Sequence, residues 1–228
     1  MNFALECCEM SYKENIKNFK GYECKLLQSD EDAQAYVFQM KDTTVIAFRG
    51  TSSYMDAFTD LNAFSTILPS FFFVKSSVTN NNDIKVHAGF LKQYISLRKQ
   101  ILENIKREKI IVTGHSLGGA LSQIAALELS SFADLSCITF GSPRVGNKEF
   151  AKFLSEKVPN NLAIVHKLDP IPQLPSFWGW WKHPSTKRLE VSENILTEHF
   201  EDKNNFSFNV WNPSKAHTLQ SYKMNLIV

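Results

Sequence analysis

The stretch "TGHSLGGALSQ" (113–123) decides the fold class, because it sets a serine between two glycines where a strand turns into a helix. The run before it, "KIIVTG" (109–114), is short, apolar and rich in β-branched residues, which is typical of a buried strand. The residues after Ser116 have helical composition, with apolar side chains recurring close to every 3.6 residues. A G-x-S-x-G pentapeptide in this strand–turn–helix context is typical of a nucleophilic serine.

The two glycines have a steric purpose in this interpretation. A serine that points out of a tight turn is held in a strained backbone conformation, and glycines on either side avoid a collision between strand and helix. Gly114 and Gly118 occupy those positions. The alternative is a glycine-rich loop that binds a phosphate, but the chain has neither G-x-x-x-x-G-K-[ST] nor G-x-G-x-x-G.

Strand-like and helix-like segments alternate along the chain, which predicts an α/β fold with a central, mostly parallel sheet. The first two strands are expected to form a hairpin, and the length of 228 residues predicts one domain, 1–228. The predicted strands are 35–40, 44–50, 109–114, 135–141 and 162–168, and the predicted helices are 89–107, 116–130 and 147–157.

Composition excludes several classes of function. The net charge of +2 and the lack of a basic stripe argue against a nucleic-acid partner. No apolar stretch has the length of a membrane span. Oligomeric state is not indicated.

The N-terminus and the cysteines predict the compartment. Residues 1–19 lack the features of a signal peptide and are expected to form the first amphipathic helix. Cys7, Cys8, Cys24 and Cys137 suit neither a disulfide framework nor a spaced metal site. We therefore expect a cytoplasmic protein with no metal and no cofactor, in which the thiols of Cys7 or Cys8 could be exposed.

One long segment, 52–85, does not follow the alternation. It holds an aromatic cluster, Phe71–Phe73, after Pro69 and then a run of asparagines. A core segment followed by a surface loop is one interpretation. An insertion of this length is also typical of a functional element, so a lid-like insertion is the other.

Six motifs, taken together and in this order, resemble the class 3 lipase family of fungal-type triacylglycerol lipases and related esterases. The resemblance spans roughly residues 35–222 and implies an α/β-hydrolase fold. The motifs are "AFRGT" (47–51), "VHAGF" (86–90), "VTGHSLGGA" (112–120), "TFGSPRVGN" (139–147), "VHKLDPIPQLP" (165–175) and the histidine of "AHTLQSY" (216–222).

The resemblance implies a Ser–His–Asp triad of Ser116, His217 and Asp169. The residues agree with it, because Asp169 follows a predicted strand and the chain order Ser…Asp…His is that of α/β-hydrolases. His217 starts a short helical pattern that Ser214 is expected to cap. The resemblance favours His217 over five other histidines: His115 should point away from the serine, His87 and His183 are expected to be structural, and His166 and His199 lie in a strand and a charged segment.

The oxyanion hole is expected at two positions. The N–H of Leu117 would be unpaired at the start of the helix, and the resemblance adds Thr51 through its backbone and hydroxyl.

The resemblance implies hydrolysis of carboxylic esters of lipids through an acyl-enzyme, with a lipid–water interface as one place where the substrate is met. The alternatives are a phospholipase or lysophospholipase, an acyltransferase or a peptidase on the same triad, and a silent lipase-like domain that binds lipid or a protein partner. The chain departs from the family pattern at Ala57, where lid segments often carry tryptophan. Trp178, Trp180 and Trp181 cluster beside the Asp169 loop and suit either lipid contact or packing.

Overall fold

The computed structural model describes residues 1–51, 64–73, 83–175, 181–184, 187–192, 195–199 and 213–226. Its centre is a nine-stranded sheet in the order β1-β2-β3-β4-β7-β8-β10-β12-β13. The five strands β4, β7, β8, β10 and β12 are parallel, whereas the strands at the two edges are antiparallel. The strands are β1 (Asn18–Phe19), β2 (Tyr22–Gln28), β3 (Gln34–Gln39), β4 (Thr43–Phe48), β7 (Lys109–His115), β8 (Asp134–Phe140), β10 (Asn161–His166), β12 (Lys187–Ser192) and β13 (Ile195–His199).

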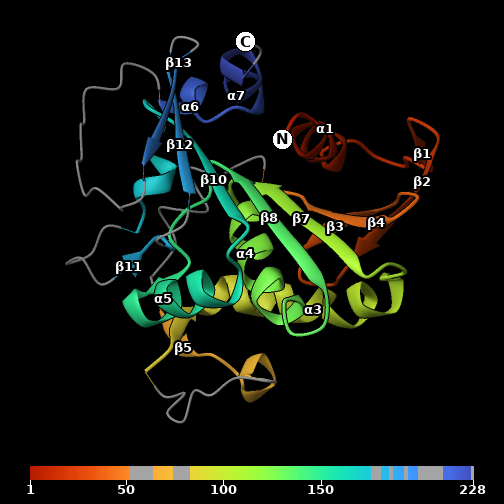
Figure 1. Ribbon diagram of the computed structural model, residues 1–228, viewed down its shortest axis with the longest axis horizontal. Coiled ribbons are helices and arrows are strands. Elements are labelled where there is room, and N and C mark those ends of the chain that lie inside the picture. Colours follow the sequence, from red (N-terminus) through yellow and green to blue (C-terminus); the bar gives the residue numbers. More distant parts are fainter. Residues whose placement is uncertain are drawn as a thin grey trace.

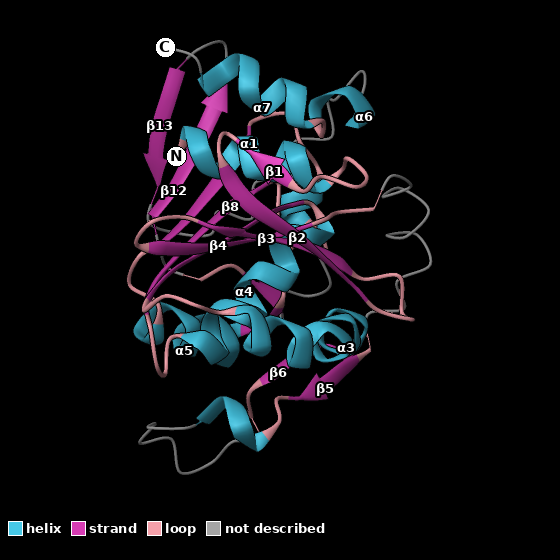
Figure 2. Ribbon diagram, turned by 90° about the vertical axis from the view of Figure 1, so that its right-hand side faces the viewer, coloured by secondary structure: helices cyan, strands magenta, loops and turns pink. Residues whose placement is uncertain are grey.

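Helices cover both faces of this sheet (Figure 1). Figure 2 shows α3, α4 and α5 on one face and α1, α6 and α7 on the other, with the two chain ends on the same side. The helices are α1 (Asn2–Ser11), α3 (Ala88–Asn104), α4 (Leu117–Leu129), α5 (Lys148–Lys157), α6 (Pro213–Ala216) and α7 (Leu219–Leu226).

The strands divide their side chains between two cores because successive residues of a strand point to opposite faces. In β4, Ile46 and Phe48 belong to the core beneath α3 and α4, whereas Val45 and Ala47 pack toward α1. Every residue of α4 after Leu117 is buried, so this helix lies inside the molecule and not on its surface. A helix fixed on all sides holds the residue before it, Ser116, in one place.

A second sheet of four strands, in the order β11-β9-β6-β5, lies beyond α3 and α5. A 3₁₀ helix, η1 (Ser70–Phe73), follows its edge strand, and there Phe72 and Phe73 are buried in the main core. For these residues the packing interpretation is confirmed; residues 52–63 and 74–82 of the expected lid lie outside the described residues. The strands are β5 (Ser65–Ile67), β6 (Lys85–His87), β9 (Gly146–Asn147) and β11 (Trp181–Lys182).

The predicted strands and helices are all present, and β3 and β4 form the expected antiparallel pair. The first helix is shorter than predicted: it ends at Ser11, and β1 begins at Asn18. Asn15 lies between them with a φ of +56°, a left-handed conformation that breaks a helix.

Candidate active site

Ser116 occupies the turn between β7 and α4, as the sequence predicts. Its φ of +57° and ψ of −127° are strained for a residue with a side chain. A Cβ at Gly114 would collide with the carbonyl of Gly118, and a Cβ at Gly118 would collide with the carbonyl of Phe48. The steric prediction for the two glycines is therefore confirmed.

The Ser116 side chain is completely buried and its hydroxyl makes no hydrogen bond within the described part of the chain. Its backbone is held firmly, because its N–H donates to Phe140 O at 3.0 Å and its carbonyl accepts from Gly119 N at 2.9 Å. A buried hydroxyl without a hydrogen-bond partner is uncommon in proteins, and it indicates a functional role because it does not contribute to stability.

Asp169 and His217 form a buried pair. The carboxylate oxygen Oδ2 of Asp169 accepts from Nδ1 of His217 at 2.7 Å, and both side chains are completely buried. The other carboxylate oxygen, Oδ1, accepts from the N–H of Ile171 at 2.9 Å, at the start of the 3₁₀ helix η2 (Ile171–Gln173). With Nδ1 donating to the carboxylate, a neutral His217 ring has its lone pair on Nε2.

His217 lies in the turn between α6 and α7, so the prediction that it starts a helix capped by Ser214 is wrong: Ser214 is inside α6. The side chain of His217 is nevertheless completely buried. The sequence predicted His217 as the histidine of the site, but it did not predict that His217 lies in a turn.

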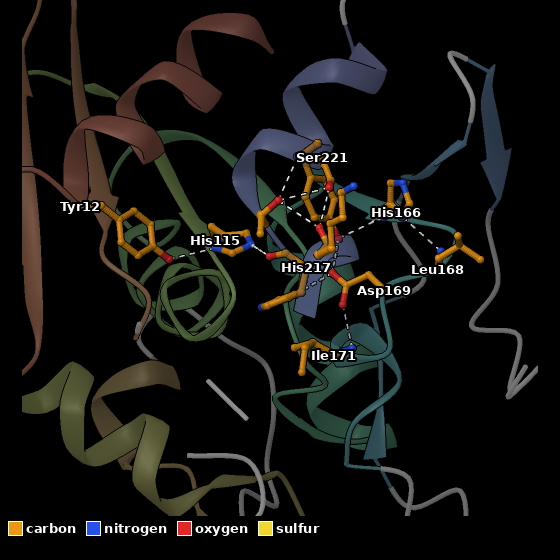
Figure 3. Close-up of polar contacts among 11 residues, drawn as sticks. Tyr12, His115, His166, Leu168, Asp169, Ile171, His217 and Ser221 are labelled. Atoms are coloured by element: carbon orange, nitrogen blue, oxygen red, sulfur yellow. Dashed lines mark hydrogen bonds and ion pairs between the residues drawn. The ribbon is translucent and has the colours of Figure 1, made fainter. Parts of the chain in front are cut away.

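His115 connects the two halves of the site. Its ring centroid lies 4.6 Å from that of His217, and Ser116 is the next residue along the chain. Its Nε2 is 2.8 Å from the carbonyl oxygen of His217, and its Nδ1 is 2.9 Å from the hydroxyl of Tyr12. Figure 3 shows Tyr12, His115, His217, Asp169 and Ile171 joined in one row of hydrogen bonds. Both ring nitrogens of His115 are engaged, so His115 is not a candidate base.

Tyr222 and Gly141 complete the surroundings of Asp169, and sequence reasoning missed both. The Tyr222 hydroxyl donates to Oδ2 of Asp169 at 2.5 Å and accepts from the N–H of His166 at 3.1 Å. Gly141 has a φ of +57°, and a Cβ there would lie 2.8 Å from both Asp169 Oδ2 and the Tyr222 oxygen. The available signal was the glycine of "TFGSPRVGN", since only glycine allows so close an approach.

The remaining histidines have structural contacts. Nδ1 of His87 caps α3 by accepting from Phe90 N at 3.3 Å, and burial lowers the pKa of His87 to about 4. Nε2 of His183 is 2.5 Å from the carbonyl of Pro172, and Nδ1 of His166 accepts from Leu168 N at 3.2 Å. The structural interpretation of His87 and His183 is thus confirmed. The side chain of His199 lies outside the described residues.

Thr51 and Leu117, the two predicted oxyanion-hole residues, belong to the same pocket. Both line a pocket of about 300 Å³, and Leu117 is the first residue of α4, whose N–H has no acceptor within the helix. Thr51 follows Gly50, where an added Cβ would lie 3.4 Å from the Ser116 Cβ. The other residues that line the pocket are Asp32, Ala33, Gln34, Arg49, Gly50 and Gln93.

Trp181 is buried, with 3% of its surface exposed, and its ring centroid lies 5.9 Å from that of His87. Both residues belong to the small sheet, and β11 also contacts α5, so Trp181 has a packing role. Trp178, Trp180 and Ala57 lie outside the described residues.

Comparison with known proteins identifies the family. The family model described as "Lipase (class 3)" matches residues 45–178, more than half of the chain. The chain belongs to the class 3 lipase family. The resemblance stated from the motifs is therefore confirmed, and so is the α/β-hydrolase fold.

Two curated relatives and one solved structure illustrate the likeness. A lipase of Rhizopus niveus is 34% identical over 172 residues, covering 68% of this chain and 41% of that protein. A secreted mono- and diacylglycerol lipase of Gibberella zeae is 33% identical over 186 residues, covering 68% of this chain and 45% of that protein. A triacylglycerol lipase, described as having a serine-protease triad at its catalytic centre, superposes with a TM-score of 0.68 at 26% identity, covering 85% of this chain and 79% of that one. The chain spans less than half the length of these two curated relatives.

The expected cytoplasmic location is wrong. The Gibberella zeae relative is named a secreted enzyme, which contradicts it. The expectation rested partly on unpaired cysteines, but all four cysteines are buried. Buried thiols do not indicate a compartment, and of the two cysteines whose thiols were open to exposure, Cys7 and Cys8, both are buried. Among the described residues, no helix combines the length and hydropathy needed to cross a bilayer.

Proposed function

We propose that this protein hydrolyses carboxylic esters of lipids, acylglycerols in particular, as one α/β-hydrolase domain with Ser116 as nucleophile. The observation that carries the proposal is the buried Asp169–His217 pair. The ring of His217 packs against His115, the residue before Ser116, whose buried hydroxyl has no hydrogen-bond partner in the described ranges. The ion pair between Glu9 and Lys223 at 3.0 Å, which joins the two ends of the chain, supports a single domain.

The three residues divide the steps of the reaction between them. His217 takes the proton of the Ser116 hydroxyl through Nε2 as the oxygen attacks the ester carbonyl, and a covalent acyl-enzyme forms when the alcohol leaves with that proton. Asp169 keeps the hydrogen of His217 on Nδ1 and stabilises the imidazolium. Water, deprotonated by the same histidine, then releases the acid and restores Ser116.

Thr51 and Leu117 stabilise the negative charge on the carbonyl oxygen. The N–H of Leu117 lies at the start of α4, where the helix dipole adds positive charge, and Thr51 lines the same pocket. Loss of one such donor typically costs about 3 kcal/mol of transition-state stabilisation. One relative is named a mono- and diacylglycerol lipase and one solved structure a triacylglycerol lipase, which supports acylglycerols as the substrate class.

The test is hydrolysis by the purified protein of short-, medium- and long-chain acyl esters, below and above their solubility limits. Ser116→Ala is the active-site variant, and Ser155→Ala, which removes a hydroxyl from α5, is the matched control. A fluorophosphonate probe followed by peptide mapping identifies the labelled serine. We expect labelling of Ser116 and ester hydrolysis in the wild type and in Ser155→Ala, and neither in Ser116→Ala.

The pattern of substrates separates the alternatives. Activity that rises when a long-chain substrate forms an interface identifies a lipase, whereas activity on soluble short chains alone identifies an esterase. Preference for phospholipids would indicate a phospholipase. Absence of labelling and hydrolysis would overturn the proposal in favour of a silent lipid-binding domain.

A further inference from the structure

The residue that ends the first helix reaches the candidate active site. Tyr12 directly follows α1, and its hydroxyl lies 2.9 Å from Nδ1 of His115, although the two residues are 103 positions apart in the chain. The same hydroxyl lies against Gly50, where an added Cβ would collide with it and would approach the carbonyl of His115 to 2.6 Å. One phenol thus contacts the segment before Thr51 and the segment before Ser116.

The direction of the hydrogen bonds follows from the charge state of His115. Burial, and secondarily the neighbouring His217, hold the pKa of His115 well below its ordinary value, so the ring is neutral at pH 7 and carries one N–H. Nε2 is 2.8 Å from the carbonyl oxygen of His217, which can only accept, so we assign the hydrogen to Nε2. Nδ1 is then the acceptor, and the Tyr12 hydroxyl donates to it.

This arrangement holds His217 at two points. Asp169 fixes the ring through Nδ1, and His115 fixes the backbone through the carbonyl. The second hold matters because His217 lies in the turn between α6 and α7, away from the regular hydrogen bonds of either helix. Without the hydroxyl of Tyr12, the neutral His115 ring could move its hydrogen to Nδ1, and Nε2 would no longer donate to His217.

We propose that Tyr12 and His115 are positioning residues for the reaction proposed above: the Tyr12 hydroxyl fixes the tautomer of His115, and His115 fixes the backbone of His217 beside Ser116. The inference rests on the proposed function. Neither residue touches the substrate. Their effect is on the alignment of the base and the nucleophile, an alignment to which reaction rates are very sensitive.

Tyr12→Phe tests the inference, because it removes one oxygen and keeps the ring. The matched control is Tyr36→Phe. Tyr36 is also buried, and its hydroxyl binds the same N-terminal segment through Lys13 O and Ile16 N, both at 3.2 Å, without contacting the site. We expect Tyr12→Phe to lower kcat between about 10- and 100-fold with KM unchanged, and Tyr36→Phe to leave kcat near that of the wild type. Equal losses of kcat in the two variants, or no loss in Tyr12→Phe, would overturn the proposal.

A double-mutant cycle examines the path of the effect. We expect Tyr12→Phe to lower kcat little further once His115→Leu is present, because the hydroxyl acts through the imidazole. Fully additive losses of kcat in the cycle would show that Tyr12 does not act through His115 and would overturn the proposal.

Nuclear magnetic resonance of ¹⁵N-labelled histidine provides a readout that does not depend on activity. It distinguishes protonated from unprotonated ring nitrogens, so the wild type should show His115 with hydrogen only on Nε2, and Tyr12→Phe should show a mixture of tautomers. A wild-type His115 with hydrogen on Nδ1 would overturn the proposal. If no ester is hydrolysed and Ser116 is not labelled, the proposed function fails. The spectrum still decides whether the Tyr12 hydroxyl fixes the tautomer of His115.

Discussion

Two buried carboxylates, one in the candidate active site and one on α4, have surroundings that differ in one respect. Asp169 lies between β10 and η2 with 1% of its surface exposed, and Glu128 lies in the last turn of α4 with 4% exposed. Each accepts a hydrogen bond from a tyrosine hydroxyl: Tyr222 at 2.5 Å and Tyr94 at 2.7 Å. The difference is in the cation.

Glu128 has a permanent counter-charge. The guanidinium of Arg98 donates to it through Nε at 2.8 Å and lies 4.2 Å from the ring centroid of Phe71 in η1. Asp169 has no lysine or arginine partner among the described residues, and its contacts are an amide, a phenol and an imidazole. Because a buried charge is costly without a counter-charge, Asp169 gains its full partner only when His217 takes a proton. An arginine balances a charge permanently, whereas a histidine balances it during a reaction.

The largest expected effect is on catalysis at Asp169. Asp169→Asn keeps the size of the side chain but presents an amide to His217, which favours the wrong tautomer. We expect kcat to fall about 10⁴-fold, as is typical of this change in serine-hydrolase triads. The measurement is hydrolysis of a soluble ester. Glu128→Gln is the matched change at the other carboxylate and should leave kcat near the wild-type value; similar losses of kcat in the two variants would contradict the comparison.

The second effect is the pH dependence of stability at His87. His87 caps α3, the helix that carries Arg98, the partner of Glu128. The pKa of His87 is about 4 in the folded protein and about 6.5 in the unfolded chain. Between these values the unfolded state binds more protons at His87 than the folded state does. The contribution of neutral His87 to the free energy of unfolding is therefore fully present above pH 6.5 and is lost as the pH drops toward 4. One proton corresponds to about 1.4 kcal/mol per pH unit, which sets the slope expected in urea unfolding.

His87→Asn separates titration from capping. Asparagine is a good N-cap and still accepts from Phe90 N, but it does not bind a proton in this range. We expect a flatter decline in the free energy of unfolding between pH 6.5 and 4. An unchanged slope in His87→Asn would show that other groups, such as the buried His115, account for the acid sensitivity.

The third effect is on stability at Glu128. Glu128→Gln removes the charge that faces Arg98 while it keeps an acceptor for Tyr94. Because a third of the Arg98 side chain remains exposed and can contact water, we expect a loss of about 2 kcal/mol in the free energy of unfolding. Glu103→Gln, in an exposed pair with Lys99 at 3.9 Å on α3, is the control and should change stability by less than experimental error. The prediction fails if the two variants lose the same stability.

The residues of the candidate site could be predicted where adjacent positions in the sequence identify them. Ser116 was marked by the glycines around it, and Asp169 by its place after a strand. His217 needed the family resemblance, because nothing local separates it from five other histidines.

Tyr12, Gly141 and Tyr222 were not predicted because their roles depend on contacts between distant segments. Tyr222 is 53 residues from Asp169, and its place beside the carboxylate follows from the packing of α7 on the sheet. The last two strands of the large sheet, β12 and β13, were missed for a related reason. Their sequence is rich in charged residues, and they become strands by pairing with β10 and with each other.

The smallest expected effect compares the two tyrosines. Tyr222→Phe and Tyr94→Phe each remove one hydroxyl that donates to a buried carboxylate, so each should lower the free energy of unfolding by about 1 kcal/mol. Only Tyr222→Phe should change catalysis, because Asp169 then loses one of two donors on Oδ2 and is less firmly oriented toward His217. We expect kcat to fall roughly tenfold in Tyr222→Phe and to stay within twofold in Tyr94→Phe, measured on one soluble ester. If kcat falls equally in both, the hydroxyls act on catalysis only through stability, and the two carboxylates are more alike than their partners indicate.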